Sequence, residues 1–198
     1  MTELEALKFF QTPDHPCSYL PSEQATTVFA DPDAIIDTQL YTQLSQLGFR
    51  RSGAHIYRPY CHACTACIPV RIPVSAFAAK RRHQRVRMRN QALTKHRLAP
   101  HNSDEIWMLY ERYINHRHSD GDMFPADREQ FVSFLVTGRP EAFFTEYRLG
   151  EQLIAVAVSD QLDDGLSAIY TFFDPDHAAR SLGTLAILDL MQQTNAAA

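Results

Sequence analysis

The amino-acid sequence predicts an α+β fold with two domains: a small cysteine-bearing domain over residues 1–76, and a domain of helices and a mainly antiparallel sheet over residues 77–198. Three observations predict this fold. A C-x₂-C-x₂-C cluster joins two strand-like segments in the first half of the chain. Three consecutive strand-like segments with tight turns between them occupy the second half. Segments with helical periodicity precede and follow these strands.

The first domain is expected to hold one helix and two short strands. Apolar residues recur at helical spacing over residues 33–48, with Asp33 as a candidate N-cap and Gly48 where a C′ glycine belongs. Residues 55–59 and 68–74 have the composition of strands. Two prolines in the second segment limit it to an edge strand or an irregular segment, because proline cannot donate to a sheet.

The second domain is expected to hold helices around a three-stranded meander. The expected helices and strands are, in order, helices at 103–118 and 127–138, strands at 142–149, 153–160 and 166–173, and a helix from Ser181 to Gln193. This order resembles the acetyltransferase-like (GNAT-like) acyl-transfer fold. In that fold, the turn after the central strand offers backbone N–H groups at a helix N-terminus, which is a natural phosphate site. Here that turn would place Leu182 and Gly183 at the anion, helped by Arg180. The match is partial, because Leu185 stands where cofactor-binding members carry a second small residue.

The distribution of charge predicts a polyanionic partner. Residues 80–97 carry eight positive charges and no acidic residue, whereas the whole chain has a net charge of −4 and the remainder therefore −12. The alternative is a solvated arginine-rich helix face, although acidic residues usually alternate with basic ones on such faces. The residues of this basic segment that we propose to bind the polyanion are Lys80, Arg81, Arg82, Arg85, Arg87 and Arg89, and the segment also contains Lys95 and Arg97.

The cysteines suggest a metal site. Cys61, Cys64 and Cys67 are two residues apart, and Cys17 could complete a set of four thiolates for zinc or an iron–sulfur cluster. The alternative is that the thiols are reduced and inert, because free cysteine packs as a small hydrophobic residue. A disulfide is less favoured, because the sequence has neither a signal peptide nor a membrane-length apolar run and is expected to be cytoplasmic.

Four arginines near this cysteine loop are candidate ligands of a carboxylate: Arg50, Arg51, Arg58 and Arg71. A guanidinium group holds a carboxylate through two parallel hydrogen bonds. For any single one of them, an internal salt bridge is the competing interpretation.

Taken together, these motifs closely resemble the bacterial aspartate/glutamate leucyltransferases, which are aminoacyl-tRNA–protein transferases. The resemblance covers residues 8 to 192 and is most specific in "GFRRSGAHIYRPYCHACTACIPVR" and "DGLSAIYTFFDPD". It implies transfer of leucine from Leu-tRNA to proteins that begin with Asp or Glu, which would create an N-degron, and it implies no cofactor for the chemistry. The segment "RMRNQAL" lacks a charged pair that the family usually has. The family continues beyond "MQQTNAAA", so the chain is expected to be truncated, with an exposed apolar face on its last helix.

The resemblance gives each cluster an expected role. The basic segment would hold the tRNA, the four arginines would hold the acidic first side chain of the acceptor protein, and the thiols would organise the loop between them. Glu146 and Tyr170 would lie near the reacting centre, and Asp174 would orient the amine or take its proton. The structural alternatives are a Glu146–Arg148 pair, a core position for Tyr170 and a turn-capping role for Asp174.

Two other functions fit parts of the sequence. A CoA-dependent acetyltransferase would use the phosphate-binding turn but has no need for the basic segment. A metal-stabilised RNA-binding module would use the basic segment and the cysteines without catalysis.

Overall fold

The computed structural model describes residues 3–197 of the chain, and these form two compact units. The first unit comprises Met1–Arg71 and Leu162–Asp164, and the second comprises Ile72–Gln161 and Gly165–Ala198. Both contain helices and antiparallel sheets, which confirms the predicted combination of helices with mainly antiparallel sheets.

The first unit is built on a four-stranded sheet in the order β1-β4-β6-β5. Its strands are β1 (Phe9–Gln11), β4 (Thr27–Ala30), β6 (His55–Pro59) and β5 (Arg50–Ser52). The unit also contains η1 (Leu4–Ala6), the two-stranded sheet β2 (His15–Pro16) and β3 (Gln24–Ala25), and helix α1 (Thr38–Gln46). Of the two strands expected here, 55–59 is confirmed as β6.

Helix α1 begins later than the sequence suggested. Its N-cap is Asp37, whose Oδ1 accepts a hydrogen bond from the Leu40 N–H at 2.9 Å, so the assignment of Asp33 as N-cap is wrong. The expected end is confirmed, because Gly48 has φ +84°, a conformation that favours glycine. A Cβ atom at Gly48 would also lie 2.9 Å from Cγ of Pro69. The glycine therefore lets the segment after the cysteines pass close to the end of α1.

The segment 68–73 forms no strand, in agreement with the irregular alternative that its prolines left open. Pro69 and Pro73 lack the N–H groups that a sheet requires. The apolar side chains of the segment are exposed, with Ile68 at 74% and Val70 at 82% of their accessible surface.

The second unit is built on a four-stranded antiparallel sheet in the order β10-β9-β8-β7. Its strands are β7 (Leu93–Leu98), β8 (Ala142–Leu149), β9 (Gln152–Leu162) and β10 (Gly165–Phe173), the tip of the β9–β10 hairpin being assigned to the first unit. Its helices are η2 (Val74–Ala76), α2 (Arg81–Arg89), α3 (Asp104–Arg117), α4 (Arg128–Phe131), the π-helical η3 (Val132–Val136), η4 (Pro175–Arg180) and α5 (Leu182–Ala197). The predicted meander and the helices at 103–118, 127–138 and 181–193 are confirmed.

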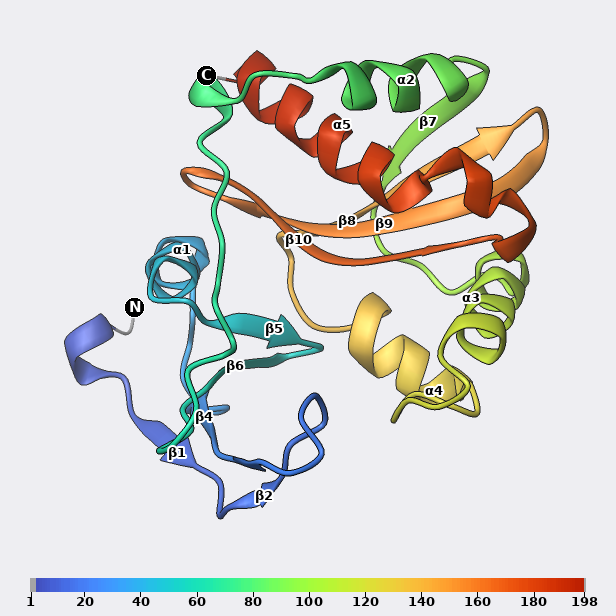
Figure 1. The fold of residues 1–198 in the computed structure, drawn as a ribbon. Coiled ribbons are helices and arrows are strands. Elements are labelled where there is room, and N and C mark those ends of the chain that lie inside the picture. The colour runs from blue at the N-terminus through green and yellow to red at the C-terminus, as the bar shows by residue number, and fades with distance from the viewer. Residues whose placement is uncertain (1–2, 198) are drawn as a thin grey trace. The chain divides into compact units, whose positions relative to one another are not determined.

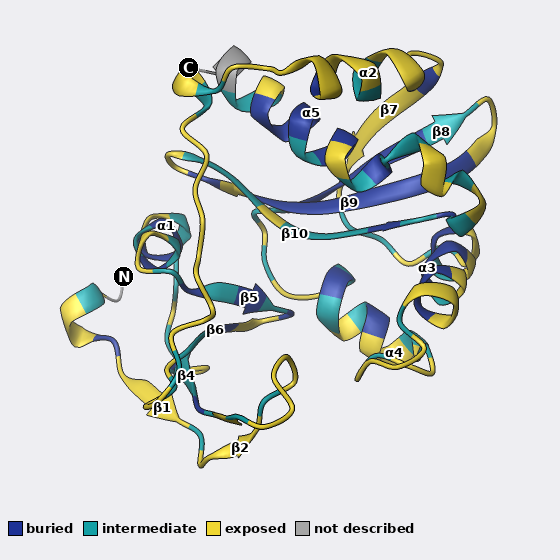
Figure 2. Ribbon diagram, viewed as in Figure 1, coloured by how far each residue is buried: buried dark blue, intermediate teal, exposed yellow. Residues whose placement is uncertain are grey.

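The two faces of this sheet are covered by different helices (Figure 1). On one face, Tyr147 and Ile154 pack against Leu182 and Leu185 of α5. On the other face, the side chains of β8, β9 and β10 form an aromatic core with α3 and α4. Strand β9 is buried along most of its length, whereas the outer side of α2 is exposed (Figure 2). The core of the unit therefore holds β8 and β9 rigidly between two layers.

The expectation of an exposed apolar face on the last helix is wrong for the part of it whose side chains the structure describes. Leu182, Leu185, Leu188 and Met191 are all at least 92% buried, as are the other large apolar side chains of α5 except the half-buried Ile187. They are covered because α5 packs against the sheet and is flanked by α2.

Within the described residues, no helix combines the length and the apolar composition that a membrane crossing requires.

Candidate functional site

The basic segment folds as helix α2 followed by strand β7, which the sequence had not indicated as a strand. Lys80, Arg81, Arg82, Arg85 and Arg89 are exposed, and Arg87 is half-buried. In the part of the chain that the structure describes, no arginine of α2 forms an ion pair with an acidic residue. The charge of this helix is therefore not neutralised by its own fold.

The two cations of the basic segment that lie on β7, Lys95 and Arg97, interact with other side chains of the protein. Lys95 Nζ forms an ion pair with buried Asp189 at 2.8 Å. The guanidinium group of Arg97 lies 3.5 Å from the centroid of the Phe143 ring and donates to Gln161 at 3.3 Å. These two cations on β7 are less available to a ligand than the arginines of α2.

Helix α2 is fixed to the start of α5, which brings several of the proposed RNA-binding residues together. The Asn90 side chain donates to the Arg180 carbonyl at 2.9 Å, and Arg180 Nη1 donates to the Arg89 carbonyl at 3.1 Å. Gly183 lies in the first turn of α5, and a Cβ atom there would meet no atom within 4 Å. The backbone before α5 is turned sharply at Ser181, which has φ 55° and ψ 48°. The N–H groups at the start of α5 thus lie beside two arginines and open space.

Glu146 lies in the middle of β8, and only 4% of its surface is exposed. Its Oε2 accepts a hydrogen bond from Arg148 Nε at 3.0 Å, and its Oε1 lies 3.7 Å from His101 Nε2. Arg148 also binds Glu105 of α3 at 2.6 Å. The structural alternative of a Glu146–Arg148 pair is therefore realised, and His101 and Glu105 are partners that the sequence did not indicate.

Asp174 follows the end of β10 and is 3% exposed. Its Oδ1 lies 3.1 Å from Arg112 Nη1 and accepts from the Asp176 N–H at 3.0 Å, which is the turn-capping geometry. Its Oδ2 lies 3.3 Å from His177 Nδ1. Arg112 is 62 residues away in the sequence, so no local pattern could have identified it.

Tyr170 belongs to an aromatic cluster on the α3 face of the sheet. Its ring packs edge-on against Phe134 at 5.5 Å and Tyr113 at 6.3 Å, and its hydroxyl lies 4.0 Å from the Met123 sulfur. Burial raises the pKa of Tyr170 well above its usual range, and it raises the pKa of its neighbour Tyr110 to about 12. At neutral pH, Tyr170 is therefore a hydrogen-bond donor rather than a base.

The three candidate catalytic residues all lie in the second unit, but the structure gives them separate partners. Among the described residues, no hydrogen bond or ion pair joins Glu146, Tyr170 and Asp174 to one another. They therefore do not form a preassembled triad.

The four candidate acceptor-binding arginines lie in the first unit. Arg51 is buried, and Arg51 Nη1 donates to the Gly53 carbonyl at 3.3 Å. Arg58 donates to the Leu47 carbonyl at 3.0 Å, and Arg71 donates to the Gln46 carbonyl at 2.5 Å. The last two thus bind carbonyl groups at the end of α1, where positive charge is favourable.

Arg50 differs from the other three arginines. It is half-buried on β5, opposite Tyr57 in the sheet register. Burial raises the pKa of Tyr57, and the positive charge of Arg50 partly offsets that rise. No described residue forms a hydrogen bond or an ion pair with the Arg50 side chain. Its donors are therefore free for a ligand.

The four cysteines also lie in the first unit, as free thiols. Cys17 Sγ accepts a hydrogen bond from the Tyr19 N–H at 3.4 Å, and Cys61 Sγ lies 3.8 Å from the Thr26 carbonyl. Within the described residues, no three His, Cys, Asp or Glu side chains are grouped so that they could hold a metal ion. The described structure therefore does not group Cys17, Cys61, Cys64 and Cys67 as ligands, and the four-thiolate metal site stays a prediction.

Comparison with known proteins identifies the family. Residues 15–85 match the model for the N terminus of arginine-tRNA-protein transferase, and residues 105–198 match the model for its C terminus. An aspartate/glutamate leucyltransferase of Pseudomonas paraeruginosa is 55% identical over 194 residues, which are 98% of this chain and 83% of that protein. Proteins with the same name from Pseudomonas fluorescens and Stutzerimonas stutzeri are each 54% identical over 188 residues, which are 95% of this chain and 80% of each relative. The chain therefore belongs to the arginine-tRNA-protein transferase family, and within it to the aspartate/glutamate leucyltransferases.

Proposed function

We propose that this protein transfers leucine from Leu-tRNA to the N-terminal α-amine of proteins that begin with Asp or Glu. The observation that carries this proposal is a basic helix, α2, whose arginines have no acidic partner among the described residues, in a chain 55% identical to a protein named for leucyl transfer. A leucine placed on such proteins would act as an N-degron in the cytoplasm.

The arginines of α2 suit the backbone of a tRNA. Arg82, Arg85 and Arg89 follow one another at helical spacings of three and four residues, so they project from one side of the helix. Contacts of arginine with phosphate position an RNA without reading its sequence. The start of α5, with Arg180 and the open space at Gly183, adds an anion site for the acceptor end of the tRNA.

The chemistry is aminolysis of an ester. The amine nitrogen attacks the leucyl carbonyl carbon, a C–N bond forms, and the C–O bond to the terminal ribose breaks. The amine loses a proton and the departing ribose oxygen gains one. Because an α-amine has a pKa of about 7.7–8.0, a useful part of it is already neutral near pH 7. The protein must therefore position the two reactants, stabilise the oxyanion and guide one proton.

The second unit offers side chains for these tasks. Tyr170 retains its proton, so we assign it hydrogen-bond donation to the oxyanion rather than proton acceptance. Arg148 holds the Glu146 carboxylate in place, and Arg112 holds that of Asp174. Each carboxylate is therefore suited to orient the ammonium group of the acceptor or to accept a proton from it. The element order from β7 to α5 supports an acetyltransferase-like arrangement of this unit.

The acidic first residue of the acceptor needs a cation. Of the four arginines in the first unit, we assign this role first to Arg50, because its donors have no partner among the described residues. Arg71 is exposed and has donors left beyond the one that binds Gln46, so it is the second choice. No step of the reaction is assigned to the cysteines.

Transfer of labelled leucine from Leu-tRNA to peptides that differ only in their first residue tests this proposal. We expect labelling of peptides that begin with Asp or Glu, and little or none of those that begin with Asn, Gln, Lys or Ala. Acetyl-CoA serves as the alternative donor. Acetylation without leucine transfer would indicate a CoA-dependent acetyltransferase, and RNA binding with neither transfer would indicate a binding module.

A further inference from the structure

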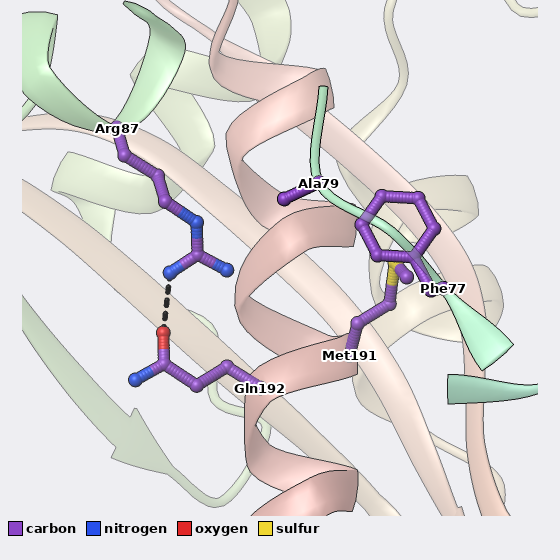
Figure 3. Close-up of a pocket in the computed structure, with 5 residues that line it drawn as sticks. All are labelled: Phe77, Ala79, Arg87, Met191 and Gln192. Atoms are coloured by element: carbon purple, nitrogen blue, oxygen red, sulfur yellow. Dashed lines mark hydrogen bonds between the residues drawn. The ribbon is translucent and has the colours of Figure 1, made fainter. Parts of the chain in front are cut away.

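An open pocket of about 350 Å³ lies beside α2, away from the candidate catalytic residues. It is lined by Phe77, Ala79, Arg87, Met191 and Gln192 (Figure 3). Phe77 and Ala79 precede α2, Arg87 projects from α2 toward α5, and Met191 and Gln192 belong to α5. Its size is in the range of about 300–1,000 Å³ that is usual for ligand pockets.

The walls of the pocket differ in chemistry. Phe77, Ala79 and the buried Met191 form an apolar wall. Opposite them, the Arg87 guanidinium group is held in place by the Gln192 side chain and by the Leu188 carbonyl, 3.0 Å away. One wall thus suits the face of a flat, apolar ring, and the other offers a fixed cation and an amide.

We propose that this pocket binds a base from a single-stranded part of the tRNA. The inference rests on the proposed function and extends it by naming a second kind of RNA contact. Single-stranded bases are bound by stacking on apolar and aromatic side chains and by hydrogen bonds to Arg and amide groups. The surroundings favour RNA over an apolar protein segment, because the same helix carries exposed arginines that have no acidic partner among the described residues.

The position of the pocket fits this assignment. Gln192, which lines the pocket, lies nine residues beyond Gly183 on α5, a distance of about 14 Å along the helix axis. The end of α2 and its C-cap contact both regions, because Arg87 binds Leu188 and Gln192 while Asn90 binds the Arg180 carbonyl just before α5. One RNA strand could therefore place phosphate at the start of α5 and a base in the pocket.

The test fills the pocket without changing charge. Ala79 and Ala78 are adjacent exposed alanines, but only Ala79 lines the pocket, so Ala79→Leu is the test variant and Ala78→Leu its matched control. The probes are an RNA hairpin that ends in single-stranded ACCA-3′ and the same hairpin with a blunt end. The tailed hairpin is also prepared with 2-aminopurine in place of a tail adenine, because the fluorescence of this base responds to stacking.

We expect Ala79→Leu to weaken binding of the tailed hairpin about fivefold or more, as loss of one stacked base would. It should leave binding of the blunt hairpin, and the salt dependence of both, unchanged, because no phosphate contact is lost. The 2-aminopurine signal on binding should appear with Ala78→Leu and be lost with Ala79→Leu.

Three results would overturn the proposal. Unchanged binding of the tailed hairpin by Ala79→Leu would show that no base enters the pocket. Equal weakening of both hairpins, or a smaller salt dependence, would show that the pocket does not distinguish a base from the RNA backbone. These two results leave the proposed function intact. Failure of the unaltered protein to bind either hairpin would overturn the pocket proposal, whereas the proposed function is decided separately by leucine transfer from intact Leu-tRNA.

Discussion

The arginines of the first unit and those of helix α2 belong to one residue type but have different surroundings. Arg51, Arg58 and Arg71 each donate a hydrogen bond to a backbone carbonyl of their own unit. Arg87 and Arg89 of α2 likewise donate to the Leu188 and Ala179 carbonyls. No acidic residue of the described chain pairs with any arginine of α2, however, and the exposed Arg81 and Arg85 have no hydrogen-bond partner among the described residues. The number of cations in a segment therefore does not measure its capacity to bind an anionic ligand. That capacity depends on the arginine donors and charges that the fold leaves without partners.

The two groups of arginines should differ most in their effect on the stability of the fold. Replacing buried Arg51 with Met leaves the Gly53 carbonyl without this donor, so we expect the free energy of unfolding to fall by about 1–3 kcal/mol. The matched change Arg81→Met on α2 removes an exposed side chain and should alter it by less than about 0.5 kcal/mol. Urea denaturation of both variants measures this. Equal stability of the two would show that Arg51 has no structural role.

A smaller effect is expected on acceptor preference when Arg50 is replaced, because Arg50 is the arginine of the first unit that has no partner among the described residues. Arg50→Met should reduce the preference for Asp-led over Asn-led peptides by roughly tenfold, because a charge-assisted pair with the acceptor carboxylate is lost. Relative rates of leucine transfer to the two peptides measure it. Arg58→Met is the control, since Arg58 already binds the Leu47 carbonyl. If the preference survives Arg50→Met and falls in the control, the assignment of Arg50 is wrong.

Much of the second unit could be predicted because its signals are local. The strands at 142–149 and 166–173 show in apolar composition and in turn residues, and the helix at 103–118 shows in its periodicity and in Ser103, whose Oγ accepts from the Ile106 N–H. Strand β7 could not be predicted in this way. Its residues after Leu93 are all exposed, and it exists because it pairs with β8, which is distant in the sequence.

In the candidate site, too, contacts between residues close in sequence could be predicted, whereas contacts between distant residues could not. The Glu146–Arg148 pair joins residues two apart on one strand, a spacing that places both on one face. The Arg112–Asp174 and Lys95–Asp189 pairs join residues that only the folded chain brings together. Because these pairs decide which cations are neutralised, the sequence could locate the basic segment but not distinguish α2 from β7 within it.

If the arginines of α2 that lack an acidic partner among the described residues hold the tRNA backbone, the salt dependence of Leu-tRNA binding should depend on them. The unaltered protein is compared with a triple variant, Arg81→Glu, Arg82→Glu and Arg85→Glu, and with Lys95→Gln, whose cation already pairs with Asp189. Each lost contact with duplex phosphate lowers the slope of log affinity against log salt by about 0.9. We predict a fall of up to about 2.7 for the triple variant and almost none for Lys95→Gln. An unchanged slope in the triple variant, or an equal loss per charge in Lys95→Gln, would contradict the account.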